Sequence, residues 1–212
     1  MSKHCQLPGL RKKLDDAITY GTENALSLAE LSLRIAQNRK YTGEIEYFSG
    51  QLDILNGDFH SAIIHFDAAI KHNPYDGGAY NDRALCMVEL GKINEALEYF
   101  DRGIEVESDY ANIYHNKGWF LNHVGRHNEA IACFNKALEL EPDRPVTYDN
   151  LADAQYNLGD YAQSMANYRK VLELLKENCC EELEEIKEEI QKRIGEIEEK
   201  SRQEKDDGFK DD

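Results

Sequence analysis

Three histidines lie close together near the middle of the chain, and their imidazole nitrogens are possible metal ligands. They are His115, His123 and His127. The surrounding pattern predicts a helix that carries the first two eight residues apart, so they lie about 12 Å apart at ~1.5 Å per residue. All ligands of a zinc ion lie within about 2.1 Å of it. The first two histidines therefore cannot share an ion, and we expect a polar helix face and no metal.

The five cysteines give no redox or catalytic pattern. No two have metal-site spacing, and the adjacent Cys179 and Cys180 are poorly placed to bridge each other. We expect reduced thiols, a cytoplasmic location, and a small core residue at Cys86. We find no phosphate-binding glycine loop and no catalytic Ser/His/Asp or Cys/His order. The sequence therefore predicts a non-enzymatic protein without a cofactor.

Polar residues that recur every 34 positions suggest a binding function instead. Asp82, Asn116 and Asn150 keep this spacing. An asparagine side chain both donates and accepts hydrogen bonds, so such a series can hold a peptide backbone without reading its side chains. The alternative is that each residue only bonds to a neighbouring structural unit.

The 34-residue spacing extends to residues that must pack. Small residues recur where two helices would cross closely, and an aromatic residue fills the space to the next unit. A fixed period of this length is typical of stacked helical repeats, and 34 residues leave no room for an added strand. We expect pairs of helices that bury their faces only by stacking. The small residues are Gly50, Ala84, Gly118 and Ala152 on one helix and Ala62, Ala96 and Ala130 on the facing helix, and the aromatic residues are Phe66, Phe100, Phe134 and Tyr168. Gly57, Gly91, Gly125 and Gly159 recur with the same period.

The four units, at 43–76, 77–110, 111–144 and 145–178, resemble the tetratricopeptide repeat family. The third matches the family pattern best, through Tyr114, Gly118, Gly125, Ala130, Phe134, Ala137 and Pro142. The others depart at Asp53, Ser108 and Ser164, where the pattern has Tyr, Pro and Ala. The resemblance implies an all-α, right-handed superhelical solenoid of antiparallel helix pairs that binds other proteins.

In this family the first helix of each repeat lines a concave groove that receives a peptide or a partner helix. Trp119, the only tryptophan, is a candidate binding hot spot, although it could instead pack against the next repeat. The groove is acidic, and it lacks the basic residues that clamp a terminal carboxylate in chaperone-adaptor members. We therefore expect a neutral-to-basic protein segment as the partner. The candidate site residues are Tyr47, Gln51, Asn81, Asp82, His115, Asn116, Trp119, Asp149, Asn150 and Asp153.

Helical segments are also expected on both sides of the repeats. Residues 1–8 form a tail, and residues 9–42 read as a degenerate helical hairpin, with helices over 9–20 and 22–38, that covers the first repeat. Residues 179–201 read as a charged capping helix, and 202–212 as a disordered acidic tail.

The connection between the fourth repeat and the C-terminal helix has two interpretations. The apolar residues from Leu172 to Ile197 follow an 11-residue period, which favours one continuous helix. Asn178 and Glu181 resemble a capping box, which favours a break near 176–180. The long apolar stripe also leaves open a scaffold that self-assembles through the array or this helix.

The net charge of −16 argues against two classes of partner. Nucleic-acid binding requires Lys and Arg to neutralise phosphates, and an anionic membrane surface repels an acidic protein. Residues 177–212 hold 15 acidic and 7 basic side chains, and their net charge of −8 is half of the total. No apolar stretch approaches the ~18 residues of a membrane span, and the first residues contain no apolar segment typical of a secretion signal.

Overall fold

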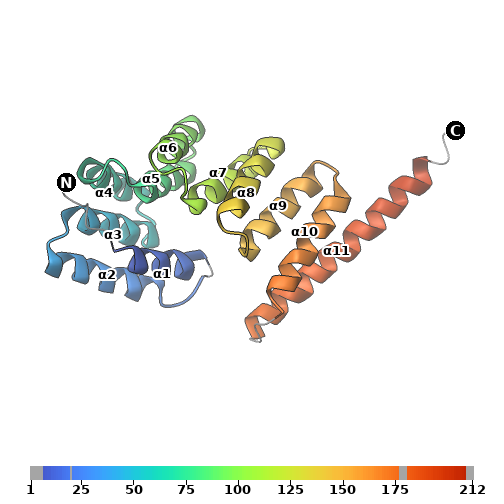
Figure 1. Cartoon of the computed structure of the whole chain (residues 1–212), viewed down its shortest axis with the longest axis horizontal. Helices are drawn as coiled ribbons and strands as arrows, with labels where there is room; N and C mark the ends of the chain where they lie inside the picture. The colour runs from blue at the N-terminus through green and yellow to red at the C-terminus, as the bar shows by residue number, and fades with distance from the viewer. Residues whose placement is uncertain (1–6, 20, 177–180, 209–212) are drawn as a thin grey trace. The chain divides into compact units, whose positions relative to one another are not determined.

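The computed structural model describes residues 7–19, 21–176 and 181–208, and within these ranges it contains helices and no strands. The chain divides into two compact units, residues 1–113 and 114–212. The helices are labelled in Figure 1. Their bounds are α1 Pro8–Thr19, α2 Ala25–Arg39, α3 Thr42–Leu55, α4 Phe59–His72, α5 Gly77–Glu89, α6 Ile93–Val106, α7 Ala111–His123, α8 His127–Leu140, α9 Pro145–Asn157, α10 Tyr161–Leu174 and α11 Glu181–Gly208.

Successive helices pack as the repeat pattern predicts. In the first unit α3 pairs with α4 and α5 with α6, while α4 also packs on α5. In the second unit α9 pairs with α10 and also packs on α8. The expected all-α fold of stacked helix pairs is therefore confirmed.

The turn inside each pair is set by one glycine. Gly57, Gly91, Gly125 and Gly159 have φ of +78°, +70°, +79° and +79°. An L side chain is disfavoured in this left-handed region, whereas glycine enters it readily. The chain reverses at this residue, and the next helix starts two residues later.

The small residues lie where the helices of a pair cross. A Cβ on Gly50 would lie 2.9 Å from the ring of Phe66, and one on Gly118 would lie 2.8 Å from the ring of Phe134. Both rings are fully buried. The prediction that Gly50 and Gly118 lie at close helix crossings is confirmed, and the ring against each glycine comes from the second helix of the same repeat.

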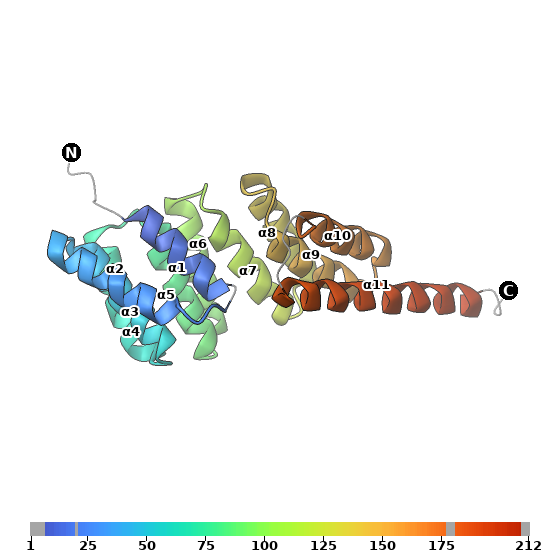
Figure 2. The ribbon, with the colours of Figure 1, turned by 90° about the horizontal axis from the view of Figure 1, so that it is seen from below.

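The charged helix α11 covers the end of the second unit, where it lies beside α10 (Figures 1 and 2). Ile190 and Ile197 are each 3% exposed and pack with Tyr168, Val171 and Leu175 of the α10 segment. Ile186, in contrast, is 44% exposed. The apolar stripe of α11 is thus used within the chain as a cap.

Helix α10 ends at Leu174 and α11 begins at Glu181, so these are two helices; Asn178, Cys179 and Cys180 lie outside the described residues. The expected disorder from residue 202 is corrected, because α11 continues to Gly208. Residues 202–205 are good helix formers, and Arg202 pairs with Glu198 one turn earlier. Among the described residues, no helix is long and apolar enough to cross a membrane.

Candidate functional site

The four candidate residues of the first unit are buried. Tyr47, Gln51, Asn81 and Asp82 are exposed by 1%, 3%, 2% and 7%. Gln51 donates to the Tyr47 hydroxyl at 3.0 Å and to Asp82 at 2.5 Å, and Asn81 donates to Asp82 at 2.9 Å. The expectation that these residues line an open groove is corrected, because they bond to one another beneath another part of the chain.

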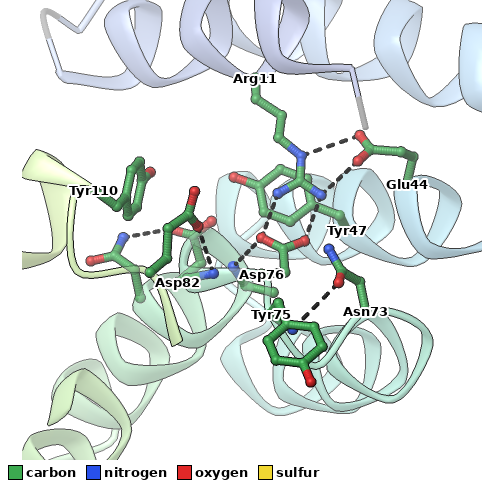
Figure 3. Close-up of polar contacts among 12 residues, drawn as sticks. Arg11, Glu44, Tyr47, Asn73, Tyr75, Asp76, Asp82 and Tyr110 are labelled. Carbon is green, nitrogen blue, oxygen red and sulfur yellow. Dashed lines mark hydrogen bonds and ion pairs between the residues drawn. The ribbon is translucent and has the colours of Figure 1, made fainter. Parts of the chain in front are cut away.

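Arg11, which α1 carries, lies over the ring of Tyr47. Its guanidinium carbon lies 3.6 Å from the centroid of the Tyr47 ring. Nη2 is 2.7 Å from Glu44 of α3, and Nη1 is 2.8 Å from Asp76, which precedes α5 (Figure 3). Only 11% of the Arg11 side chain is exposed, against 2% for Glu44 and 3% for Asp76. We call Glu44, Tyr47 and Asp76 the arginine cradle.

The cradle is built by the helices of the first two repeats. Asp76 is the N-cap of α5, where its side chain accepts from the backbone N–H of Ala79 at 3.1 Å. An N-cap carboxylate is favoured because it satisfies an unpaired amide and the helix dipole. The local structure that starts α5 therefore also places a negative charge beneath α1.

One turn along α1 from Arg11, Asp15 makes a second polar contact. Its carboxylate accepts from the Asn112 amide at 3.2 Å and from the Tyr110 hydroxyl at 3.4 Å. Burial, followed by repulsion from Asp82, raises the pKa of Asp15 to about 7. Burial also raises the pKa of Asp82 to about 6, against hydrogen bonds from Tyr47 and Asn81 that lower it. These two carboxylates oppose the docking of α1 when both are ionised.

The sequence pattern did not identify Arg11, Asp15 or Asp76 as site residues. Asp76 had a usable signal, because an aspartate directly before a helix is a common N-cap. Arg11 had none, since it stands beside Lys12 and Lys13 and only the fold separates the buried cation from the exposed ones.

In the second unit, His115 is also buried. It is 6% exposed, its Nδ1 lies 2.9 Å from the hydroxyl of Thr147, and its ring packs on Phe134. Burial, with a smaller contribution from Arg144, lowers the pKa of His115 to about 3. The expectation of an exposed groove histidine is corrected: this neutral imidazole ties α7 to α9.

The remaining five candidates stay partly accessible on α7 and α9. The Trp119 ring lies against the His123 ring at a centroid distance of 4.4 Å and an interplanar angle of 48°, and the His123 Nδ1 lies 2.9 Å from the Trp119 carbonyl oxygen. Both residues belong to α7, so this ring contact does not bury the indole against a second helix. The half-buried residues are Asn116, Trp119, Asp149, Asn150 and Asp153.

Arg193 of α11 lies close to Asp149 and Asp153, the two acidic residues among these five. Arg193 of α11 lies 3.7 Å from Asp149 and 3.6 Å from Asp153, and the Tyr168 hydroxyl donates to Asp153. Burial, followed by repulsion from Asp153, raises the pKa of Asp149 to about 6. Arg193 is 37% exposed, so water reaches this pair far more than it reaches Arg11.

The site chemistry is therefore that of cation recognition by carboxylates and aromatic rings. Each unit pairs inner-helix carboxylates with an arginine from a flanking helix. Among the described residues, no group of three His, Cys, Asp or Glu side chains is arranged to hold a metal ion.

Two family models match the sequence, and both describe a tetratricopeptide repeat. One matches residues 49–110 and the other residues 109–177. Together they span more than half of the chain. No curated protein matches it.

Solved structures share the fold at low identity. TTC0263, a thermophilic TPR protein of Thermus thermophilus, is 20% identical, with a TM-score of 0.67 over 90% of this chain and 97% of that one. PilF of Pseudomonas aeruginosa is 20% identical, with a TM-score of 0.66 over 78% and 72%. The first TPR of Spaghetti (RPAP3), bound to the HSP90 peptide SRMEEVD, is 19% identical, with a TM-score of 0.54 over 56% and 96%.

Proposed function

Because this chain belongs to the tetratricopeptide repeat family, whose fold generally serves protein interaction, we propose that it is a non-enzymatic adaptor. Its accessible binding site lies on α7 and α9. The site comprises Asn116, Trp119, Asp149, Asn150 and Asp153. Its ligand is a neutral-to-basic segment of another protein, either extended or helical.

The contrast in burial between the two units carries this proposal. The four candidates of the first unit are buried, whereas the five on α7 and α9 are half-buried. A half-buried tryptophan beside asparagines offers an apolar anchor and hydrogen-bonding groups for a peptide backbone. The second unit can therefore receive a partner without prior rearrangement of α1.

Charge selects the kind of partner. Asp149 and Asp153 already attract Arg193, and like charges across an interface disfavour an acidic segment. One structural neighbour holds the HSP90 peptide SRMEEVD. On α7 and α9, the places that would hold basic clamp residues are Asn112, Asn116, Val146 and Asn150. We therefore do not propose that this chain binds an acidic peptide tail.

The alternative is a scaffold that self-assembles through the repeat array or through the apolar stripe of α11. Ile190 and Ile197 pack on α10 within the chain, which favours the adaptor. Light scattering over a range of concentrations separates the two functions. A monomer at all concentrations supports the adaptor, and a mass that grows through contacts of α11 supports the scaffold.

The direct test compares partner capture by the unmutated chain and three variants. Trp119→Ala should cost about 2 kcal/mol or more in binding, and Asn116→Ala and Asn150→Ala about 0.5–1.5 kcal/mol each. Asn128→Ala is the control, because Asn128 is exposed on α8. Captured proteins are identified by mass spectrometry, and the binding segment is then titrated by calorimetry. Full affinity in all three variants, or a strongly acidic segment, would reject this site.

A further inference from the structure

The contacts of Arg11 are those of a bound ligand. Nη1 and Nη2 each lie 2.8 Å from an oxygen of Asp76, while Nη2 and Nε lie 2.7 and 3.2 Å from the two oxygens of Glu44. The cation also lies over the Tyr47 ring. Two bidentate carboxylates and an aromatic face match a planar guanidinium, and a lysine ammonium cannot reproduce this geometry.

We propose that the arginine cradle is a second protein-binding site, specific for an arginine on an amphipathic helix, and that α1 is its displaceable internal ligand. The partner helix carries an arginine and, three residues later, an apolar side chain, as Arg11 and Leu14 do in α1. The site goes beyond the function proposed for α7 and α9, because it lies in the first unit and opens only when α1 leaves.

The way α1 is held supports its displacement. Within α1 only Leu14 and Ala17 are buried, while Lys12, Lys13 and Ile18 are exposed. Arg11 supplies its ion pairs and Asp15 its contact with Tyr110 and Asn112. Few buried apolar groups and a short, largely exposed helix are features of segments that open locally.

Two of the three cradle residues, Tyr47 and Asp76, have partners outside α1. Tyr47 packs on Phe48 and Phe66, and Asp76 caps α5. Both residues keep these partners when Arg11 leaves, so the same carboxylates and ring become available to a second arginine. Buried carboxylates without a cation are unfavourable, and this cost favours entry of a new arginine.

An internal ligand also sets the affinity of an external one. A tethered segment acts at an effective concentration in the millimolar range, and the apparent dissociation constant of a competitor rises in inverse proportion to the open fraction. A partner helix must therefore bind more tightly than α1 alone, or must act when α1 is weakened.

The probe is a labelled peptide of residues 7–19, LPGLRKKLDDAIT, titrated by fluorescence anisotropy into full-length chains. Arg11→Ala empties the cradle, and Lys12→Ala makes the same charge change at an exposed position of α1. We expect the Arg11→Ala chain to bind the peptide at least ten-fold more tightly than the unmutated and Lys12→Ala chains. The same peptide with its arginine replaced by lysine should bind at least ten-fold more weakly.

Hydrogen exchange of the unmutated chain gives a second test that needs no variant. Amides of residues 8–19 should exchange at least ten-fold faster than those of α3 and α5. Exchange of α1 at the rate of α3 and α5 would show a permanent cap and overturn the proposal. So would a folded Arg11→Ala chain, checked by circular dichroism, that does not bind the peptide. A mass that doubles as α1 opens would make a second copy the occupant and overturn the assignment to another protein.

Discussion

Arg11 lies 3.6 Å above the ring of Tyr47, so a flanking helix places a cation on a residue that the repeat pattern assigns to an open groove. The first helices of the repeats therefore differ between the two units. In the first unit they bind a segment of the chain itself, and in the second unit α7 and α9 remain partly accessible.

The crossing of α7 and α8 should tolerate no added carbon. Gly118→Ala should cost about 1–3 kcal/mol in the free energy of unfolding, because its Cβ would lie 2.8 Å from Phe134 and 3.2 Å from the Ala130 carbonyl oxygen. Gly195→Ala on α11 is the control, since nothing lies within 4 Å of that Cβ, and it should stabilise the helix by up to about 1 kcal/mol. Urea unfolding followed by circular dichroism measures both. Equal effects would contradict the helix crossing.

The cap function of α11 depends on which of its isoleucines are buried. Ile190→Ala should cost about 2–5 kcal/mol, because it leaves a cavity against α10. Ile186→Ala should cost less than about 1 kcal/mol, because Ile186 is 44% exposed. Thermal unfolding compares the two. A larger loss for Ile186 would mean that α11 docks through another face.

His115 should remain neutral well into the acid range. Its pKa is lowered to about 3, and between this value and the ordinary 6.5 the unfolded chain binds more protons. Its contribution to stability therefore falls as the pH drops below about 6.5. NMR should show the neutral imidazole at pH 4.5. Protonation near pH 6.5 would mean that the ring is solvated and that its contact with Thr147 does not tie α7 to α9.

The docking of α1 should weaken as the pH rises. Asp15 faces Asp82, Arg11, Asp16 and Tyr110, and burial with the charge of Asp82 raises its pKa to about 7. A raised carboxyl pKa gives stability that is complete below about 4 and lost as the pH rises through about 7.

Exchange of the α1 amides, corrected for intrinsic rates, should therefore be faster at pH 8 than at pH 5.5. Asp15→Asn removes the titrating group and should abolish most of the difference. Asp16→Asn is the control, because Asp16 is exposed. An unchanged pH dependence in Asp15→Asn would assign the effect to another group.

The acidic pair on α9 should respond to the loss of Arg193. Burial and Asp153 raise the pKa of Asp149 to about 6, and Arg193 opposes this rise. Arg193→Ala should raise the Asp149 pKa further, while Lys192→Ala, at a residue whose side chain is 78% exposed, should leave it unchanged. Carbon-detected NMR titration of the carboxyl group measures both. Because the ion pair is partly exposed, the cost in stability should be only about 0–1 kcal/mol.

The sequence by itself determined the repeat register and the helix pairs. Turn glycines, crossing residues such as Gly118 and aromatic residues such as Phe134 each act on neighbours within one 34-residue unit, so steric requirements appear directly as a period. The charged cap was also predictable, because an apolar stripe at helical spacing must be buried somewhere.

Only the tertiary structure decided which inner-helix residues face solvent. Arg11 reaches Asp76 across 65 positions of sequence, and nothing in the period indicates that α1 would bring a cation to Tyr47. His115 likewise becomes a buried tie to Thr147 because α7 and α9 approach each other. A repeat pattern specifies the contacts within a unit and between successive units, whereas contacts with a flanking segment depend on where that segment folds back.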